Sequence, residues 1–296
     1  MLDRSARGKL LLEGSEAAEF LQGQLTNDVE ALEVGEGCYA ALLDRKGHMQ
    51  ADMRVLRPSE DEIWIDTEAE VLAATLRHLE MYKIGREVEI DDVTAARAIL
   101  SLIGPRSADL AGTPPLPEHA CEQASVGGVE SLAVGASSGI DLIAAAEDAE
   151  QLRTTLSDAG APAVSAEAAE ILRIEAGRPR FGAEMDSDTM PAEAGIVEAT
   201  VNFEKGCYIG QETVARLHYR GKPNRHLRGL RLSAPVTSGA ALNLGEKQVG
   251  RLGGSCVSPL HGPIGLAILR REAGPGAELA VGEDGVTARV VDLPFG

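Results

Sequence analysis

The pattern of apolar residues changes at Pro223, and this change constrains the fold more than any other feature of the chain. Before Pro223, stretches with helical periodicity alternate with stretches in which every second residue is apolar. After Pro223, short strand-like runs are separated by glycines, and Asp284-Gly285 is typical of a hairpin turn. The sequence therefore predicts α+β structure up to residue 222 and a small antiparallel barrel over residues 223–296.

A β-hairpin is predicted near the N-terminus, from two strand-like runs, 38–43 and 48–55, joined by a turn at 44–47. The second run alternates, so Met49, Ala51 and Met53 are expected to face the core. Asp52 is expected on the opposite, polar face. Two interpretations of Asp52 are equally good: an exposed strand carboxylate and a functional carboxylate.

Helix boundaries are predicted from capping signals. Ser15 is expected to cap a helix that ends at Leu25. Thr67 and Glu70 form a predicted capping box after a strand at 63–66. Further along, the sequence predicts a strand at 97–103, a short helix opened by Pro105, strands at 126–134 and 139–144, and helices at 147–160 and 165–177.

The segment Lys205-Gly206-Cys207-Tyr208-Ile209-Gly210-Gln211-Glu212 places one cysteine between a cation, two glycines and a polar pair. The alternating run 196–203 predicts a strand before it, and 211–217 has helix-forming character, so Cys207 is expected at a strand-to-helix corner. A nearby lysine and a helix N-terminus both favour the thiolate form of a cysteine. The alternative is a small buried filler, the usual role of a free cysteine.

The chain carries a formal charge of −18, from 28 basic and 46 acidic residues. This excess of negative charge opposes nonspecific binding to nucleic acids and to anionic membranes. The segment 213–231 contains no acidic residue, yet it carries six cations: Arg216, Arg220, Lys222, Arg225, Arg228 and Arg231. An anion-binding role and a solvated basic loop explain this basic segment equally well.

Compartment and metal chemistry are constrained by the cysteines and histidines. The four cysteines are far apart in sequence, which indicates a reducing compartment. The N-terminus does not resemble a signal peptide, and there is no apolar run long enough to span a membrane, so we expect a cytoplasmic protein. None of the six histidines has metal-ligand spacing, and no metal site is predicted.

The octad at 205–212 resembles the signature of the YgfZ-type folate-binding proteins, in the superfamily that includes the T protein of the glycine cleavage system. Similar segments occur in the expected order along nearly the whole chain, with the exception of about 105–165. They are 20–22, 25–29, 44–47, 172–179, 190–195, 265–267 and 294–295.

This resemblance implies two ferredoxin-like α+β modules and a C-terminal antiparallel barrel around a central folate cleft. The first module is expected over 1–95 with 165–222, the second over 96–164, and the barrel over 223–296.

The resemblance also implies a function: binding of tetrahydrofolate or a one-carbon derivative, in support of iron–sulfur cluster assembly or repair and, through it, of tRNA modification. The expected partners are iron–sulfur assembly proteins or cluster-carrying enzymes, and a monomer is expected. The resemblance leaves open whether such a protein is an enzyme, and the activity expected of an enzyme here is folate-dependent aminomethyl transfer.

Roles for individual residues follow from the same resemblance. Glu175 is expected to hold the amino-pyrimidine edge of the pterin, because a carboxylate accepts two parallel N–H bonds. Cys207 and Asp52 are the expected reactive residues. The expected folate-binding residues, besides Glu175, are Lys205, Tyr208, Gln211 and Arg216. From the residues alone, a salt bridge to Arg173 or Arg178 explains Glu175 better.

Two other functions remain open at this stage. The first is an aminomethyltransferase that moves a one-carbon unit to tetrahydrofolate. T proteins carry paired aspartates where this chain has Ala51-Asp52, which weakens that interpretation. The second is RNA binding through the basic segment, which the overall acidity and the 3% aromatic content disfavour.

Overall fold

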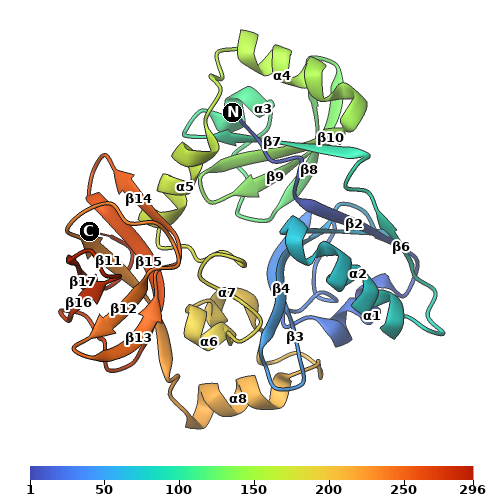
Figure 1. The fold of residues 1–296 in the computed structure, drawn as a ribbon. Coiled ribbons are helices and arrows are strands. Elements are labelled where there is room, and N and C mark those ends of the chain that lie inside the picture. Colours follow the sequence, from blue (N-terminus) through green and yellow to red (C-terminus); the bar gives the residue numbers. More distant parts are fainter. Residues whose placement is uncertain (296) are drawn as a thin grey trace. The chain divides into compact units, whose positions relative to one another are not determined.

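The computed structural model describes residues 1–295 and contains three antiparallel sheets (Figure 1). The chain forms two compact units. The first contains residues 1–44, 50–164 and 199–209, and the second contains residues 45–49, 165–198 and 210–296. The assignment of three modules, two of them ferredoxin-like, stays a prediction.

The first sheet of unit 1 has the strand order β3-β4-β5-β2-β6. Its strands are β2 (Gly8–Glu13), β3 (Glu36–Leu43), β4 (Met49–Arg57), β5 (Glu62–Thr67) and β6 (Glu89–Asp92). Helices α1 (Ala17–Gln24) and α2 (Ala69–Tyr82) lie together on one face of this sheet (Figure 1). The predicted hairpin is confirmed as β3 and β4, and Met49, Ala51 and Met53 are buried as expected.

The second sheet of unit 1 has the order β1-β7-β10-β9-β8. Its strands are β1 (Leu2–Asp3), β7 (Arg97–Ile103), β8 (Cys121–Val126), β9 (Val129–Ala136) and β10 (Gly139–Ala145). Helices α3 (Ser107–Ala111) and α4 (Ala149–Asp158), the latter preceded by the 3-10 turn η1 (Ala146–Asp148), close its core, where Leu100, Leu142 and Leu156 are fully buried.

The third sheet, in unit 2, has the order β13-β12-β16-β17-β11-β15-β14. Its strands are β11 (Arg225–Leu232), β12 (Ala241–Leu244), β13 (Lys247–Arg251), β14 (Ser255–Ser258), β15 (Gly262–Arg270), β16 (Glu278–Val281) and β17 (Val286–Val291). The predicted antiparallel barrel is only partly correct: the sheet is antiparallel, but it is an open half-barrel with β13 and β14 as its two edges. Asp284 and Gly285 lie in the loop between the paired strands β16 and β17, as predicted.

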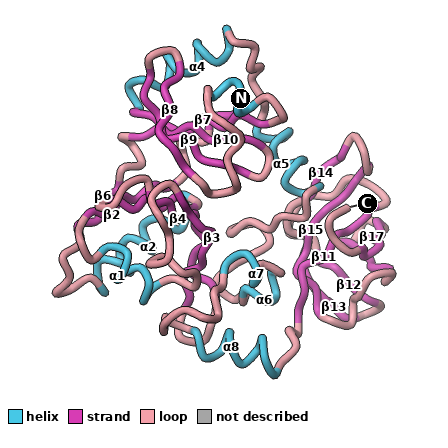
Figure 2. Tube along the Cα trace, turned by 180° about the vertical axis from the view of Figure 1, so that it is seen from behind, coloured by secondary structure: helices cyan, strands magenta, loops and turns pink. Residues whose placement is uncertain are grey.

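The remaining helices are short, and Figure 2 shows the loops that follow α5 and α7. They are α5 (Ala166–Glu175), α6 (Pro191–Ala194), α7 (Val197–Thr200) and α8 (Gln211–Arg220). Helix α5 has the predicted ends: Ser165 Oγ accepts a hydrogen bond from Ala168 N–H, and Gly177 has a φ of +69° that favours glycine. No helix among residues 1–295 is long and apolar enough to span a membrane.

Two predicted helix caps and one predicted strand are wrong. Ser15 Oγ donates to Glu87 Oε2, 3.2 Å away, and α1 begins at Ala17 without a side-chain cap. Thr67 is the last residue of β5, and its hydroxyl donates to the Asp52 carbonyl oxygen at 2.6 Å. The predicted strand 196–203 contains α7 and a loop, so Cys207 follows a loop instead of a strand.

Candidate functional site

The loop that carries Cys207 is fixed by the buried side chain of Lys205. Its ammonium nitrogen Nζ lies 2.7 Å from the carbonyl oxygens of Gln22 and Leu25 and 2.8 Å from that of Asn27. The carbonyls of Gln22 and Leu25 lie at the C-terminal end of α1, where the last carbonyls of a helix lack helical partners and attract a cation, and that of Asn27 lies in the loop that follows. Burial lowers the pKa of Lys205 to about 8. The side chain therefore joins the loop to α1.

Tyr208 fixes the other side of this loop. Its ring is buried, and Lys205 Nζ lies 5.1 Å from the ring centroid, in cation–π contact. Its hydroxyl is buried and has no hydrogen-bond partner within residues 1–295. Burial raises the pKa of Tyr208 to about 12. Between these two buried side chains, Gly206 and Cys207 are exposed.

Cys207 differs in exposure from the other three cysteines. Cys121 is buried, and Cys38 and Cys256 are partly buried. Burial raises the pKa of Cys38 to about 12 and those of Cys121 and Cys256 to about 11. Because the thiolate is the reactive form, these three sulfurs are poor nucleophiles at neutral pH. Cys207 is the cysteine that solvent reaches most readily.

Asp52 lies on the polar face of β4, as predicted. Its Oδ2 accepts a hydrogen bond from the Tyr39 hydroxyl. Its Oδ1 is inaccessible to solvent and has no partner in the part of the chain that the structure describes. Burial raises the pKa of Asp52, although the Tyr39 hydrogen bond and the charge of Arg7 oppose this shift. A carboxyl group of this kind is suited to accept and return a proton.

Arg54, two residues after Asp52 in β4, is the centre of a buried charge network in unit 1. Arg54 contacts Asp66 of β5 and Asp141 of β10, with its Nη1 2.6 Å from Asp141 Oδ2, and thereby joins the two sheets. Burial by itself would raise the pKa of Asp66, but the charges of Arg54 and Arg7 lower it to about 2. The network holds the polar face of β4 in one arrangement.

Glu175 lies in unit 2, at the C-terminal end of α5. Its Oε1 accepts a hydrogen bond from Ser258 Oγ at 2.5 Å. Arg173, one of its two candidate salt-bridge partners, is instead committed to Glu184 and Glu170, with its Nη1 2.8 Å from Glu184 Oε2. A salt bridge to Arg173 therefore does not explain Glu175.

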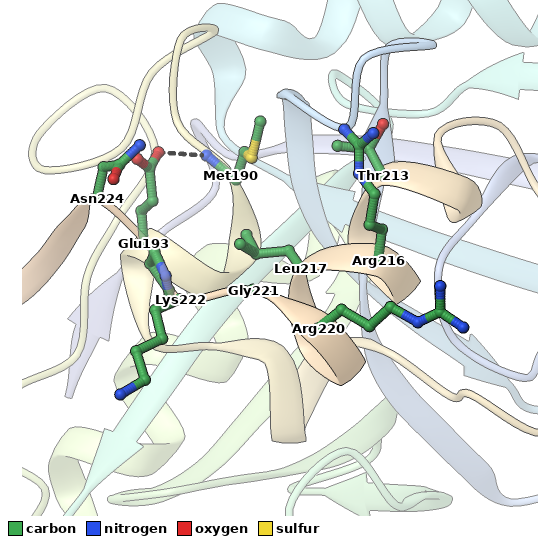
Figure 3. A pocket seen from close by; sticks show the side chains of 10 residues that line it. Met190, Glu193, Thr213, Arg216, Leu217, Arg220, Gly221, Lys222 and Asn224 are labelled. Atoms are coloured by element: carbon green, nitrogen blue, oxygen red, sulfur yellow. Dashed lines mark hydrogen bonds between the residues drawn. The ribbon is translucent and has the colours of Figure 1, made fainter.

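A cavity of about 340 Å³ opens beside the C-terminal end of α8 (Figure 3). Its apolar lining comes from Met190, Leu217 and Pro223. Its one acidic lining residue, Glu193, is paired through both oxygens with Arg225, and Oε2 also accepts the Met190 N–H. The charge of Glu193 is thus neutralised by the chain itself.

Three cations line the same cavity: Arg216, Arg220 and Lys222. Within residues 1–295 none of them has an ion pair or a side-chain hydrogen bond. Figure 3 shows Arg220 and Lys222 extending in different directions from the end of the helix, so they do not converge on one point. The cavity is therefore suited to an extended anion with several charges. Gln211, the first residue of α8, does not line it.

Two residues of these sites were not predicted. Ser258 is 83 residues from Glu175, and nothing in the sequence pairs them. Tyr39 is 13 residues from Asp52, and the predicted hairpin is the one sequence signal that brings their two strands together. No group of three or more His, Cys, Asp or Glu side chains suited to a metal ion occurs among the described residues.

The family model of the GCVT N-terminal domain matches residues 1–205. The chain belongs to the GCVT family. Among the relatives of this family member, an aminomethyltransferase of Rubrobacter xylanophilus is 30% identical, over the whole chain and 82% of the relative. An aminomethyltransferase of Thermus thermophilus is also 30% identical, over the whole chain and 86% of the relative.

A solved structure shows the same fold. The glycine cleavage system aminomethyltransferase T from Bartonella henselae superposes with a TM-score of 0.89 at 24% identity, over the whole chain and 85% of that structure. The GCVT superfamily expected from the sequence is thus confirmed. The YgfZ type is not singled out by these relatives.

The Glu175 carboxylate of this GCVT family member has the chemistry that the pyrimidine edge of a reduced folate requires. The pyrimidine edge of a pterin offers N–H donors and needs a carboxylate, and the Glu175 carboxylate is held in place by Ser258.

Proposed function

We propose that this protein binds tetrahydrofolate and uses the Cys207 thiol in the assembly or repair of iron–sulfur clusters, and so supports tRNA-modifying enzymes that carry such clusters. One observation carries the proposal. Cys207 is exposed on a loop that Lys205 and Tyr208 anchor with buried side chains. A cysteine kept only to fill space would be buried.

The proposed chemistry of Cys207 is ligand exchange. Thiolate sulfur is a soft ligand that suits iron–sulfur species. When the Cys207 sulfur binds iron, the thiol proton passes to solvent, and neither sulfur nor iron changes oxidation state. One cysteine supplies one ligand, so the other ligands of the cluster belong to a partner. The proposed partners are iron–sulfur assembly proteins or cluster-carrying enzymes.

The proposed roles in folate binding are assigned residue by residue. Glu175 anchors the amino-pyrimidine edge of the pterin, and Arg216 with the other cations of the cavity binds the glutamate tail. Asp52 holds or moves a proton at a folate nitrogen. Lys205 and Tyr208 position the Cys207 loop, and Gln211 begins the helix that carries Arg216.

A rescue experiment tests this proposal. Cells that lack the protein receive the wild type, Cys207→Ser or the matched control Cys256→Ser, and iron–sulfur enzyme activity is measured. We expect rescue by the wild type and by the control only. Tetrahydrofolate affinity, measured by calorimetry, should be the same for all three proteins. Full rescue by Cys207→Ser would refute the role of the thiol.

An aminomethyltransferase is the second candidate function. Two observations favour it. Two relatives that are aminomethyltransferases are 30% identical to this chain, and the Asp52 carboxyl is buried with a raised pKa. In this reaction the methylene group leaves an amine donor for tetrahydrofolate, and ammonia is released. Production of methylene-tetrahydrofolate by the wild type, with loss of the activity in Asp52→Asn, would favour this function over cluster assembly.

A further inference from the structure

The hydroxyl group of Ser258 contacts three polar groups. Ser258 is the last residue of β14 and is only 3% exposed. Its Oγ lies 2.5 Å from Glu175 Oε1, 3.0 Å from the backbone nitrogen of Leu260 and 2.9 Å from that of His261. These distances correspond to three hydrogen bonds.

The direction of each bond follows from the chemistry of the groups. A serine hydroxyl has one proton to donate and two lone pairs to accept with. The backbone N–H groups of Leu260 and His261 can only donate, so they occupy both lone pairs. The hydroxyl proton must then point at Glu175. Glu175 Oε1 is therefore an acceptor in this contact and cannot donate a proton to Ser258.

One small core holds both partners of this contact. Ile174, next to Glu175, is fully buried against Ile264, Leu266 and Phe295. The ring of His261 packs on Phe295, with centroids 5.9 Å apart, and this contact holds the turn that follows Ser258. Because α5 and the turn rest on the same cluster, the carboxylate and the hydroxyl keep a fixed relative position.

We propose that Ser258 is a positioning residue for the ligand site at Glu175. By donating to Oε1, it fixes the rotation of the carboxylate. The site then selects a ligand that presents two parallel N–H groups, such as the 2-amino group and adjacent ring N–H of a pyrimidinone. This inference rests on the proposed binding of tetrahydrofolate.

The test compares two ligands on four proteins. The ligands are tetrahydrofolate and an analogue in which methyl replaces the 2-amino group. The proteins are the wild type, Ser258→Ala, Ser258→Thr, which restores the hydroxyl, and Ser255→Ala. Ser255 is the matched control, because it lies in the same strand and its hydroxyl donates to the Val236 carbonyl oxygen at 2.6 Å.

We expect Ser258→Ala to bind tetrahydrofolate about tenfold more weakly than the wild type, since hydrogen bonds to charged groups contribute more than neutral ones. Its affinity for the analogue should change by less than about twofold, so discrimination between the ligands falls. Ser258→Thr should recover most of the discrimination, and Ser255→Ala should keep all of it. A purely structural role would not change the ratio of the two affinities.

The other outcomes of this test would overturn the inference. Equal weakening of both ligands in Ser258→Ala, or no weakening of either, would overturn this inference while leaving folate binding intact. A failure of the wild type to bind tetrahydrofolate would overturn the proposed function and this inference together. Thermal unfolding of Ser258→Ala and Ser255→Ala, measured in parallel, shows whether both variants are folded.

Discussion

Lys205 Nζ lies 2.7 Å from the carbonyl oxygen of Leu25, 180 residues away in the sequence. Because Gln22 and Asn27 provide two further carbonyls, the ammonium group has three backbone acceptors. The lysine of the octad therefore stabilises the loop on which Cys207 is exposed.

Replacing Lys205 with methionine should lower the free energy of unfolding by about 2–3 kcal/mol at pH 7, because three carbonyls lose a charged donor. Urea denaturation followed by circular dichroism measures this difference. Lys222→Met, which removes an exposed cation, should change stability by less than about 0.5 kcal/mol. Equal stability of the two variants would contradict the anchoring role of Lys205.

Arg54→Met should lower the free energy of unfolding more than Lys205→Met does, because it leaves Asp66 and Asp141 as buried charges with one partner fewer. Breaking a buried ion pair on one side typically costs about 3–5 kcal/mol. Arg153→Met is the control: Arg153 pairs with Asp3 and Glu150 at the surface, and its loss should cost less than about 1 kcal/mol. Denaturation curves for both variants decide between these expectations.

The difference in the free energy of unfolding between Asp52→Asn and the wild type should depend on pH. The native pKa of Asp52 is raised above its ordinary value of 3.8, so the native state holds the proton more tightly than the unfolded state. Wild-type stability therefore falls as pH rises between 3.8 and the native pKa. The neutral variant avoids this loss and should be more stable than the wild type at pH 7. Its extra stability should disappear below pH 3.8, the ordinary pKa of an aspartate.

Asp52→Asn should also lower any aminomethyl transfer by about 100-fold, since a general acid–base group is lost. Melting temperatures across the pH range and initial rates of methylene-tetrahydrofolate formation measure the two effects. A variant that is no more stable than the wild type at pH 7 would contradict a buried, destabilised carboxylate.

Alkylation of the native protein at pH 8 should modify Cys207 first. A thiol with a pKa of about 11, such as Cys121, is ionised to only about one part in a thousand at that pH. Mass spectrometry of peptides after brief iodoacetamide treatment identifies the modified residue, and Cys207→Ser should remove the fast phase. Earlier modification of Cys121 would show that the native protein exposes its buried core.

The cavity beside α8 should bind folates with a γ-linked triglutamate tail about three- to tenfold more tightly than the monoglutamate, because it carries cations without counter-charges. Arg216→Gln and Lys222→Gln should each reduce this preference, and added salt should weaken it. Lys247→Gln, which removes the same charge from a residue paired with Glu272, is the control. Titrations that find no preference in the wild type would exclude a tail site in this cavity.

Local sequence signals predicted those parts of the fold in which local and tertiary contacts agree. Both ends of α5 follow from Ser165 and Gly177, and β7 has the predicted bounds. The caps predicted at Ser15 and Thr67 failed because these hydroxyls bond to Glu87 and to the Asp52 carbonyl. The predicted barrel is an open half-barrel because short strands and glycines indicate an antiparallel sheet but do not determine whether its edges meet.

The candidate sites divide in the same way. The octad, Asp52 and Glu175 were found from residue types and spacing, since those patterns lie within short segments of the sequence. The exposure of Cys207, the bond from Ser258 to Glu175 and the neutralisation of Glu193 by Arg225 were decided by tertiary structure alone. Burial and hydrogen-bond partners depend on segments that are distant in sequence and meet only in the folded chain, so a local pattern does not predict them.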